Sequence, residues 1–467
     1  MSNILTTGFV ARVMTEHGYL VIPGTNRPIS GGASDSRLVR SGNLFAAFRG
    51  ESLDGNDFVE QAIQAGASAV ICEKQATEVP SDVTVITVPD TRAGIKDLAH
   101  AWRSTSNARV IGITGTVGKT TAKEAVAATL GVKHRVHRSA GNMNSREGLP
   151  LALLTLRKDD EISVLEMAMD SKGEILELCQ VAAPSIGVVL NIGLTHVSRL
   201  GSPDAIAREK LSLPRFLPNS GTAILNAKDP AVDSVAKELR CRVIRFGSQD
   251  SGASLIYSDL EDCGLGGYSF SVSFEGAGPV RATANITGVH TLPAALTAIA
   301  SAISVDMSLE EAVEALAEAK VPGRMQSRPT NMGATLLDDS YNSSPASLVG
   351  ALATLDRVVS RGGRGRRIAV IGPMTELGEF EEREHIAAGE TAARTCDFLF
   401  AFGEPCRAMV ETATGAGLTE AHWFSDRSAA ALAAMAVIND GDVVLLKASR
   451  SQELETVIPL LMGEVAQ

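Results

Sequence analysis

Residues 109–130 decide the fold, and they read RVIGITGTVGKTTAKEAVAATL. A short β-branched apolar run occupies residues 110–113, which is typical of a buried strand. Ala-rich sequence that favours a helix extends from Thr120 until Gly131. The loop between them contains Gly115 and Gly118. This order of strand, glycine loop and helix predicts an anion-binding site, because the loop N–H groups and the positive end of the helix face the same point.

The loop itself indicates the ligand. Residues 114–121 read TGTVGKTT, although Ile113 stands where the full nucleotide-binding consensus has its first glycine. Lys119 can reach the outer phosphates of a nucleotide, and a Thr hydroxyl can ligate Mg²⁺. The residues predicted to bind a nucleotide triphosphate here are Gly115, Thr116, Val117, Gly118, Lys119, Thr120 and Thr121. The alternative is a glycine turn before a helix that contains a lysine by chance.

Composition limits the class of protein. The chain has 467 residues, of which 45% are hydrophobic and 4% are aromatic. This length predicts two to four domains, at roughly 100 to 200 residues per domain. The abundance of Ala, Val, Leu and Gly suits parallel sheets covered by helices. A net charge of −11 argues against a nucleic-acid surface, and the basic run at 361–367 is expected to be a mobile surface loop.

Six cysteines lie far apart in the sequence, without a Cys-x-x-Cys pair. Reduced structural thiols are therefore expected. No window of about 18 uncharged apolar residues is present, as a membrane-spanning helix would need. We therefore expect a cytoplasmic protein without a membrane span, and a monomer, since nothing in the sequence requires an oligomer.

Polar and turn-forming stretches divide the chain. The link at 104–107 and the Val-Pro-Gly sequence at 321–323 predict three domains, 1–107, 108–323 and 324–467. Apolar runs alternate with helical patterns, which predicts an α/β fold with a small N-terminal α/β domain, a central doubly wound P-loop ATPase-like domain and a C-terminal Rossmann-like α/β domain. The strands expected in the second and third domains lie at 110–113, 162–167, 186–191, 223–226, 243–246, 335–339, 367–372, 398–403 and 443–447, with a hairpin at 265–274 and 280–286.

Three further side chains follow strands of the central domain. Glu166 ends the apolar run that begins at Ile162, and in a doubly wound sheet this end lies beside the phosphate loop. Glu166 is therefore placed to hold Mg²⁺, although a solvated strand-end glutamate is the alternative. His196 follows the next strand, and Lys210 lies fourteen residues later. Residue chemistry alone leaves open whether these two are functional or ordinary surface residues.

The motifs together resemble those of the Mur ligases, the ATP-dependent amide ligases of peptidoglycan precursor synthesis. The resemblance covers essentially the whole chain, because the motifs occur in the order of the family across three successive domains. They are most similar to the branch of the family that adds D-alanyl-D-alanine. The segments that carry the resemblance are 35–37, 50–58, 114–121, 141–150, 338–345, 372–378 and 446–451.

The resemblance implies roles for individual residues. Lys119, Glu166, His196, Lys210 and Arg324 would be catalytic. Lys210 would be carbamoylated and would hold a second Mg²⁺ with His196, while Thr120 and Glu166 hold the first. His290, Arg324, Asp339 and Asn342 would bind ATP. The residues implied for substrate binding are Ser34, Asp35, Ser36 and Arg37 for the UDP-sugar, Asn142 and Asn144 in a substrate loop, and Lys447, Ser449 and Arg450 in the C-terminal domain.

The implied reaction joins D-alanyl-D-alanine to UDP-N-acetylmuramoyl-tripeptide through an acyl phosphate, with ATP and Mg²⁺ at two sites. Some positions depart from the pattern of the branch, and these are Asn56, Val117, Thr291, Ala294, Ser344, Pro373 and Ala448. A divergent ligase that joins another carboxylate and amine is therefore a second hypothesis. A nucleotide-binding regulatory protein is a third, and the retained metal-site residues weigh against it.

Overall fold

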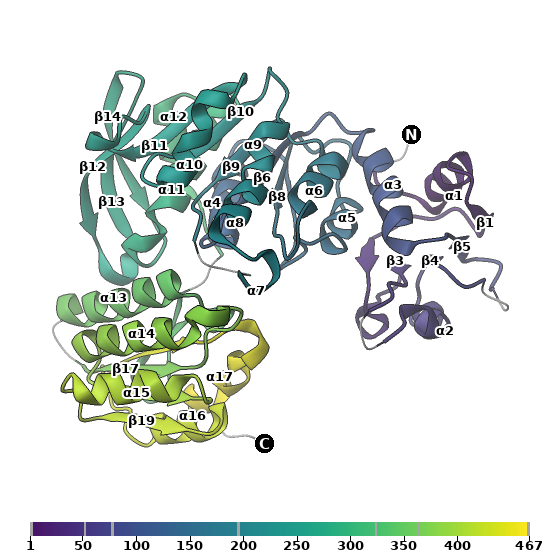
Figure 1. The fold of residues 1–467 in the computed structure, drawn as a ribbon. Helices are drawn as coiled ribbons and strands as arrows, with labels where there is room; N and C mark the ends of the chain where they lie inside the picture. Colours follow the sequence, from purple (N-terminus) through teal and green to yellow (C-terminus); the bar gives the residue numbers. More distant parts are fainter. Residues whose placement is uncertain are drawn as a thin grey trace.

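The computed structural model describes residues 3–50, 53–75, 79–193, 197–322, 325–362 and 365–464. Three β-sheets follow one another along the chain, each covered by helices. Figure 1 shows them as an N-terminal unit in purple, a central unit in teal and a C-terminal unit in green to yellow. The predicted fold class, α/β in three domains, is confirmed.

The N-terminal sheet has the strand order β1-β5-β4-β3-β2, with β1 antiparallel to β5 and the other pairs parallel. The elements are α1 (Thr7–Glu16), β1 (Leu20–Ile22), β2 (Gly31–Ala33), β3 (Asn43–Ala46), α2 (Val59–Gln64), β4 (Ala69–Cys72), β5 (Thr84–Thr87) and α3 (Thr91–Arg103).

An apolar core joins this unit to the central one. Helix α3 packs against α5 (Gly148–Leu153) and α6 (Glu174–Ala182) of the central unit. Trp102 on α3 is 2% exposed, and its indole N–H donates to the Leu156 carbonyl at 2.9 Å. The same buried cluster contains Leu149 and Leu178, so the two units share hydrophobic contacts rather than a purely polar contact.

The central sheet has the order β14-β13-β12-β11-β10-β9-β6-β8-β7, and it is parallel from β12 to β7. Strands β13 and β14 form the expected hairpin, extended by the unexpected β12, whose mainly polar sequence gives no apolar signal. The strands are β6 (Arg109–Thr114), β7 (Val136–Arg138), β8 (Ile162–Glu166), β9 (Ile186–Val189), β10 (Thr222–Asn226), β11 (Arg242–Ser248), β12 (Leu255–Asp262), β13 (Tyr268–Phe274) and β14 (Ala277–Ala284).

Helices cover both faces of the central sheet (Figure 1). One face carries α4 (Lys119–Leu130), α11 (Leu292–Ser304) and α12 (Leu309–Glu318), which share a buried core with the strands. The other face carries α5, α6, α8 (Pro203–Lys210) and α9 (Ser212–Phe216). The short helices α7 (Val197–Leu200) and α10 (Pro230–Asp233) complete this unit. The carboxyl ends of β6, β8 and β9 therefore meet at one edge, where the predicted site residues lie.

The C-terminal sheet has the order β15-β16-β20-β17-β18-β19, with only β15 antiparallel. The basic run at 361–367 was expected to be a mobile loop, but it includes the end of α13 and the start of β17, and Arg367 pairs with Asp397 at 2.7 Å. The elements are β15 (Gln326–Pro329), β16 (Thr335–Asp338), α13 (Pro345–Gly362), β17 (Arg367–Ile371), α14 (Glu381–Thr395), β18 (Phe398–Phe402), α15 (Cys406–Gly415), β19 (Ala421–Phe424), α16 (Arg427–Met435), β20 (Val443–Lys447) and α17 (Ile458–Leu461).

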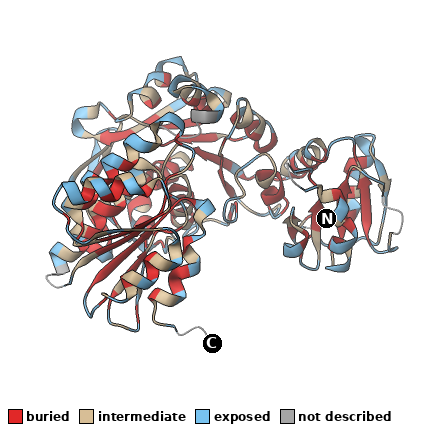
Figure 2. Ribbon diagram, turned by 60° about the horizontal axis from the view of Figure 1, so that its bottom comes forward, coloured by how far each residue is buried: buried red, intermediate tan, exposed pale blue. Residues whose placement is uncertain are grey.

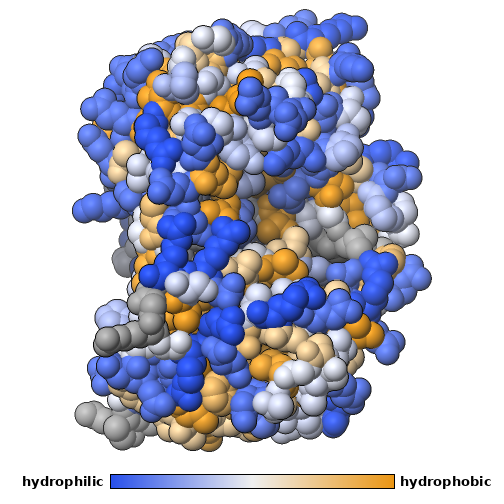
Figure 3. All heavy atoms as spheres, turned by 90° about the vertical axis from the view of Figure 1, so that its left-hand side faces the viewer, coloured by the Kyte–Doolittle hydropathy of each residue, from blue (hydrophilic) through white to orange (hydrophobic). Residues whose placement is uncertain are grey.

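Burial follows the layers of each unit. Figure 2 shows the strands of all three sheets mainly as buried and the outer helix faces as exposed. The space-filling view in Figure 3 shows a largely hydrophilic face with scattered apolar residues. Among the residues that the structure describes, no helix is both long and apolar enough to cross a bilayer.

Candidate active site

The phosphate loop connects β6 to α4. Gly118 precedes α4 with a φ of 84°, a left-handed conformation that favours glycine over residues with a Cβ. The backbone therefore turns sharply into α4 at Gly118, and the N-terminus of α4 lies at the phosphate loop. The Lys119 ammonium folds back and donates to the carbonyls of Gly115 at 2.9 Å and Thr116 at 3.1 Å. The predicted strand, loop and helix are therefore present in the order that phosphate binding needs.

Asn191 fixes the shape of this loop from the neighbouring strand. Its side-chain oxygen accepts from the backbone N–H groups of Thr116 at 3.1 Å and Val117 at 2.9 Å. Its amide nitrogen donates to the Val117 carbonyl at 2.9 Å. The Thr116 hydroxyl in turn accepts from the N–H of Gly193 at 2.8 Å. The loop after β9 thus holds the phosphate loop in place. Because Asn191 bonds to the backbone of residue 117 and not to its side chain, these contacts tolerate valine there.

Glu166 lies where the phosphate loop meets the loop at residues 139–147, which connects β7 to α5. It is 2% exposed, and its two carboxylate oxygens have different partners. The Thr120 hydroxyl donates to one oxygen at 3.0 Å, and the Asn144 amide donates to the other at 2.8 Å. A buried carboxylate beside a hydroxyl oxygen is a donor set that suits Mg²⁺. The interpretation of Glu166 as a solvated strand-end residue is wrong.

Lys210 ends helix α8 and points to the same loop. Its side chain is buried, and its ammonium donates to the Gly115 carbonyl at 2.9 Å. Burial lowers the pKa of Lys210 well below its usual range, and the nearby Lys119 lowers it further, while Glu209 acts in the opposite direction. The interpretation of Lys210 as a surface lysine is therefore wrong. A neutral buried amine is the form of lysine that can react with CO₂.

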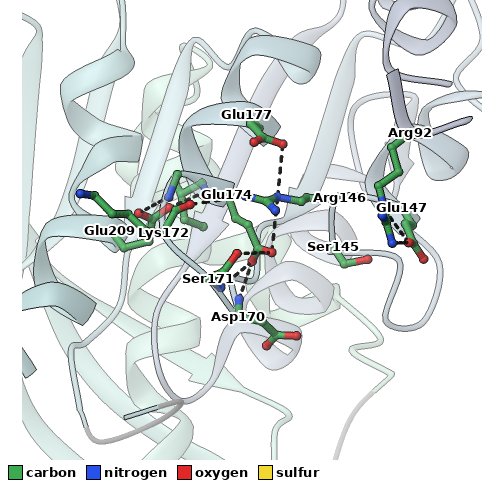
Figure 4. Close-up of polar contacts among 12 residues, drawn as sticks. Arg92, Ser145, Arg146, Glu147, Asp170, Ser171, Lys172, Glu174, Glu177 and Glu209 are labelled. Atoms are coloured by element: carbon green, nitrogen blue, oxygen red, sulfur yellow. Dashed lines mark hydrogen bonds and ion pairs between the residues drawn. The ribbon is translucent and has the colours of Figure 1, made fainter. Parts of the chain in front are cut away.

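Glu209 holds the helix that carries Lys210. Its carboxylate accepts from the backbone N–H groups of Gly173 and Ile175, each at 2.8 Å, at the start of α6. Figure 4 shows Glu209 beside the loop that follows β8, which includes Asp170 and Lys172. Because Glu209 is 6% exposed, these charge-assisted bonds fix α8 against α6 and thereby the direction of Lys210.

Two predicted residues, His196 and Arg324, lie outside the described residues. Within the described residues, no group of three or more His, Cys, Asp or Glu side chains gathers as a metal cluster. Of the four predicted ligands, Thr120, Glu166 and Lys210 lie within the described residues, and Glu166 alone among these three belongs to those residue types. The Glu166 carboxylate beside the Thr120 hydroxyl fits an implied Mg²⁺ site, and the burial of Lys210 disfavours its charged form, as carbamoylation of its amine would need.

A narrow pocket between the central and C-terminal units contains several of the residues predicted to bind ATP. It is lined by Val117, Gly118 and Thr121 from the phosphate loop, His290 before α11, and Asp339 and Lys447 from the C-terminal sheet. Burial lowers the pKa of His290, whose Nδ1 lies 3.2 Å from the Thr354 hydroxyl. The structure thus brings these residues, which lie far apart in the sequence, to one place.

The C-terminal side of this pocket is formed by a buried ion pair. The ammonium of Lys447, at the end of β20, contacts the Asp339 carboxylate at 2.5 Å and the Asn342 carbonyl at 2.8 Å. Asp339 is 4% exposed and Lys447 is fully buried. Separating the two side chains would leave an uncompensated buried charge on each. The pair therefore holds the end of β20 next to the residues that follow β16.

The other predicted C-terminal residues differ in exposure. Ser449 is 2% exposed, and its hydroxyl accepts from the Thr375 N–H at 2.9 Å, so it supports the loop after β17. Arg450 is exposed and forms an ion pair with Glu455. Arg450 and Tyr341 line a second cleft of about 400 Å³ together with Thr120. Asp339 lines both this cleft and the pocket that contains Lys447.

The N-terminal residues predicted for the UDP-sugar share one cavity of about 460 Å³, which Ser34, Asp35, Ser36 and Arg37 line together with aromatic side chains. The Asp35 carboxylate accepts from the Arg37 N–H at 2.9 Å, and the Ser36 hydroxyl donates to Gln61 at 2.9 Å. Glu147, from the substrate loop of the central unit, also lines this cavity. Asn142, in the same loop, is exposed.

Three supporting residues were not found by sequence reasoning. Asn191, Glu209 and Lys123 act on backbone groups that are distant in the chain, and Lys123 donates from a fully buried position to the carbonyls of Ser139 at 2.8 Å and Gly141 at 3.1 Å. The available signal was position: Asn191 directly follows a strand, Glu209 precedes Lys210, and Lys123 lies one helical turn after Lys119.

Family models match most of the chain in three parts. The model described as "Mur ligase family, catalytic domain" matches residues 28–103, "Mur ligase middle domain" matches 113–302, and "Mur ligase, glutamate ligase domain" matches 323–450. The order of the three is the order in which the motifs occur in the sequence.

Curated relatives and solved structures agree with these matches. The chain is 33% identical over 439 residues to the UDP-N-acetylmuramoyl-tripeptide–D-alanyl-D-alanine ligase of Bacillus subtilis, with 92% of each chain covered. It is 30% identical over 445 residues to that of Escherichia coli, with 94% of this chain and 95% of the relative covered. The structure of MurF from Acinetobacter baumannii superposes with a TM-score of 0.83 at 25% identity, covering 99% and 100% of the two chains. The MurF ligase from Thermotoga maritima in complex with ADP gives 0.77 at 27% identity, covering 93% and 97%. The chain therefore belongs to the Mur ligase family of ATP-dependent ligases.

Proposed function

We propose that this protein joins D-alanyl-D-alanine to UDP-N-acetylmuramoyl-tripeptide with ATP, and that it does so as a cytoplasmic monomer. The observation that carries the proposal is the position of Glu166, which contacts Thr120 of the phosphate loop and Asn144 of the substrate loop. A shared carboxylate of this kind brings a nucleotide phosphate and a second substrate to one point. The names of the relatives at 30–33% identity support the choice of substrates.

In this proposal, each of the three domains binds a different ligand. Residues 1–107 bind the UDP-sugar in the cavity at Asp35 and Arg37, and residues 108–323 bind ATP at the phosphate loop. Residues 324–467 bind the amine through Lys447, Ser449 and Arg450, and they close over ATP with Asp339 and Asn342. The pocket shared by Gly118, Asp339 and Lys447 supports a nucleotide site that both domains complete.

The reaction has two steps. A carboxylate oxygen of the tripeptide attacks the γ-phosphorus of ATP, the bond from phosphorus to the bridging oxygen breaks, and ADP leaves. The amine of D-alanyl-D-alanine then attacks the acyl carbon, phosphate leaves with the C–O electron pair, and the nitrogen gives up a proton. Such phosphoryl transfers depend mainly on positioning and charge neutralisation. Lys119 and Arg324 supply positive charge to the phosphates in this scheme.

Glu166 and Thr120 would hold one Mg²⁺, and His196 with carbamoylated Lys210 would hold the other. Mg²⁺, when bound, neutralises charge on phosphate oxygens. The chain supplies the rest: Asn191 shapes the phosphate loop, Glu209 directs Lys210, and Asn144 orients Glu166 toward the substrate side.

The test is ADP release by the purified protein. We expect release with ATP, Mg²⁺, UDP-N-acetylmuramoyl-tripeptide and D-alanyl-D-alanine together, and little when either substrate is omitted. No release with the complete mixture would refute the proposal. Release that does not depend on D-alanyl-D-alanine would indicate a ligase for another amine.

A further inference from the structure

Residues 144–147 connect the two sites that one substrate must occupy. At one end, Asn144 contacts Glu166 beside the phosphate loop. At the other end, Glu147 lines the N-terminal cavity, and its carboxylate pairs with Arg92 of α3 at 2.7 Å. Figure 4 shows this ion pair at the boundary of the N-terminal and central units. A molecule that fills the cavity and also reaches Glu166 therefore passes along this segment.

Arg146 lies in the middle of the segment and extends toward α6 (Figure 4). Its Nε lies 3.4 Å from the Glu174 carboxylate and 3.2 Å from the Glu177 carboxylate. Its Nη2 donates to the Lys172 carbonyl at 3.4 Å. The Arg146 side chain is 32% exposed although its Nε is buried, so the part that solvent reaches lies elsewhere on the side chain. Partly exposed ion pairs of this length are weak and exchange readily.

Both glutamates keep other partners when Arg146 is taken away. Glu177 also lies 3.5 Å from the Lys96 ammonium of α3. Glu174 accepts from the Ser171 N–H at 3.2 Å and from the Ser171 hydroxyl at 3.1 Å. A competing carboxylate can therefore take the guanidinium without leaving a buried, unpaired acid behind.

The proposed substrate carries such a carboxylate. The name of one solved relative from Acinetobacter baumannii, 26% identical to this chain, gives the acceptor peptide as alanyl-D-glutamyl-2,6-diaminopimelate. A glutamyl residue in a peptide uses one carboxyl group for its amide bond and keeps the other free. This free carboxylate lies within the stem, between the sugar and the third residue whose carboxyl group reacts.

We propose that Arg146 binds the free glutamyl carboxylate of the peptide stem and thereby selects an acidic second residue. The inference rests on the proposed function, because it takes the UDP-sugar to lie in the cavity at Glu147 and the reacting carboxyl group at Glu166. On binding, the guanidinium exchanges Glu177 for the substrate carboxylate, and Glu177 remains paired with Lys96. Planar, charge-assisted hydrogen bonds from arginine suit a carboxylate partner.

The experiment measures binding of UDP-N-acetylmuramoyl-tripeptide by calorimetry, without ATP turnover, to the full-length protein and to Arg146→Met. We expect Arg146→Met to weaken binding about 10- to 100-fold, the range for one charged hydrogen-bonded partner. With a tripeptide whose free glutamyl carboxylate is a carboxamide, the wild-type protein and Arg146→Met should bind equally. Arg215→Met is the matched control, because it removes an arginine from another partly exposed ion pair, with Glu238, and it should change nothing.

Glu177→Gln separates substrate binding from loop support. If Arg146 binds the substrate, Glu177→Gln frees the guanidinium and leaves affinity equal or tighter. If Arg146 only holds the loop, Glu177→Gln weakens binding as Arg146→Met does, and the inference is wrong. An equal loss for the acid and carboxamide substrates would also overturn it. Tight binding without ADP release in the complete mixture would contradict the proposed function and leave this inference standing, whereas absent binding to the wild-type protein would refute both.

Discussion

The ammonium groups of Lys119 and Lys210 donate to the same acceptor, the carbonyl oxygen of Gly115, each at 2.9 Å. Two positive charges around one carbonyl repel each other, and Lys210 is the more deeply buried of the two. Burial is the larger of the two effects that lower the pKa of Lys210, and the charge of Lys119 is the smaller one. The surroundings of Lys210 therefore disfavour its charged form, in the direction that carbamoylation of its amine would need.

Replacing Lys210 should abolish ligation. We expect Lys210→Ala to reduce turnover at least about 1,000-fold, since several kcal/mol of charge stabilisation at a metal site are lost. Short-chain carboxylates that imitate a carbamate should restore part of the activity. ADP release measures both effects. Lys228→Ala is the control, because Lys228 is an exposed lysine that contacts the Tyr257 hydroxyl. Full turnover in Lys210→Ala would remove Lys210 from the mechanism.

Glu166→Gln should lower the rate without disturbing the loops. Glutamine keeps the size of the side chain and can still bond to Asn144 and Thr120, while the negative charge is lost. We expect turnover to fall by roughly 100-fold or more and the Mg²⁺ concentration for half-maximal rate to rise. Steady-state rates over a Mg²⁺ series give the result. Glu238→Gln, at an exposed ion pair with Arg215, should behave as the wild type; an unchanged Mg²⁺ dependence in Glu166→Gln would exclude a metal role.

Asn191 offers a test of the phosphate loop that leaves the loop sequence intact. Asn191→Ala removes three hydrogen bonds to Thr116 and Val117, so we expect the KM for ATP to rise about tenfold. Asn191→Asp keeps the acceptor for the two N–H groups but adds negative charge beside bound phosphates. Its KM for ATP should therefore rise further than that of Asn191→Ala. A smaller effect of aspartate than of alanine would show that hydrogen bonding to the loop matters more than charge.

Stability of the C-terminal domain should decrease in mild acid because of His385. This histidine is fully buried, its Nε2 accepts from the Met374 N–H at 3.1 Å, and its Nδ1 donates to the Glu381 carbonyl at 2.7 Å. Burial lowers its pKa from the ordinary value of 6.5. The unfolded chain therefore binds a proton below pH 6.5 that the native protein does not, and the free energy of unfolding falls as the pH falls, by at most about 1.4 kcal/mol per pH unit.

Urea unfolding at pH values from 5 to 7.5 measures this dependence. His385→Gln can still accept from Met374, and it should show a flatter pH profile than the wild type. His422→Gln is the control, since His422 lies on the partly exposed edge strand β19. Identical profiles for His385→Gln and the wild type would assign the acid sensitivity to other groups.

Buried parallel strands could be predicted from the sequence, and polar edge strands could not. The sequence at 443–447 forms a strand with the expected bounds, because both faces of the strand are buried and every position except Lys447 is apolar. Strands β7, β15 and β19 lie at sheet edges, and β12 lies between β13 and β11. All four have exposed or mixed sequences, so only their long-range pairing defines them.

The same distinction applies to the site. Glu166 could be predicted because it ends an apolar strand next to the phosphate loop. Asn191 and Arg146 could not, because their partners lie about 75 and 30 residues away along the chain, and only folding brings them together. Resemblance to a family supplied Asp339 and Lys447 as separate residues, whereas their buried ion pair was not foreseen.

The most direct test of the central claim follows oxygen from substrate to product. UDP-N-acetylmuramoyl-tripeptide labelled with ¹⁸O in the reacting carboxyl group is incubated with the protein, ATP, Mg²⁺ and D-alanyl-D-alanine, and the products are analysed by mass spectrometry. We predict the UDP-linked pentapeptide, with one ¹⁸O atom transferred to inorganic phosphate for each amide bond formed. ATP hydrolysis without the pentapeptide, or a pentapeptide with unlabelled phosphate, would contradict ligation through an acyl phosphate.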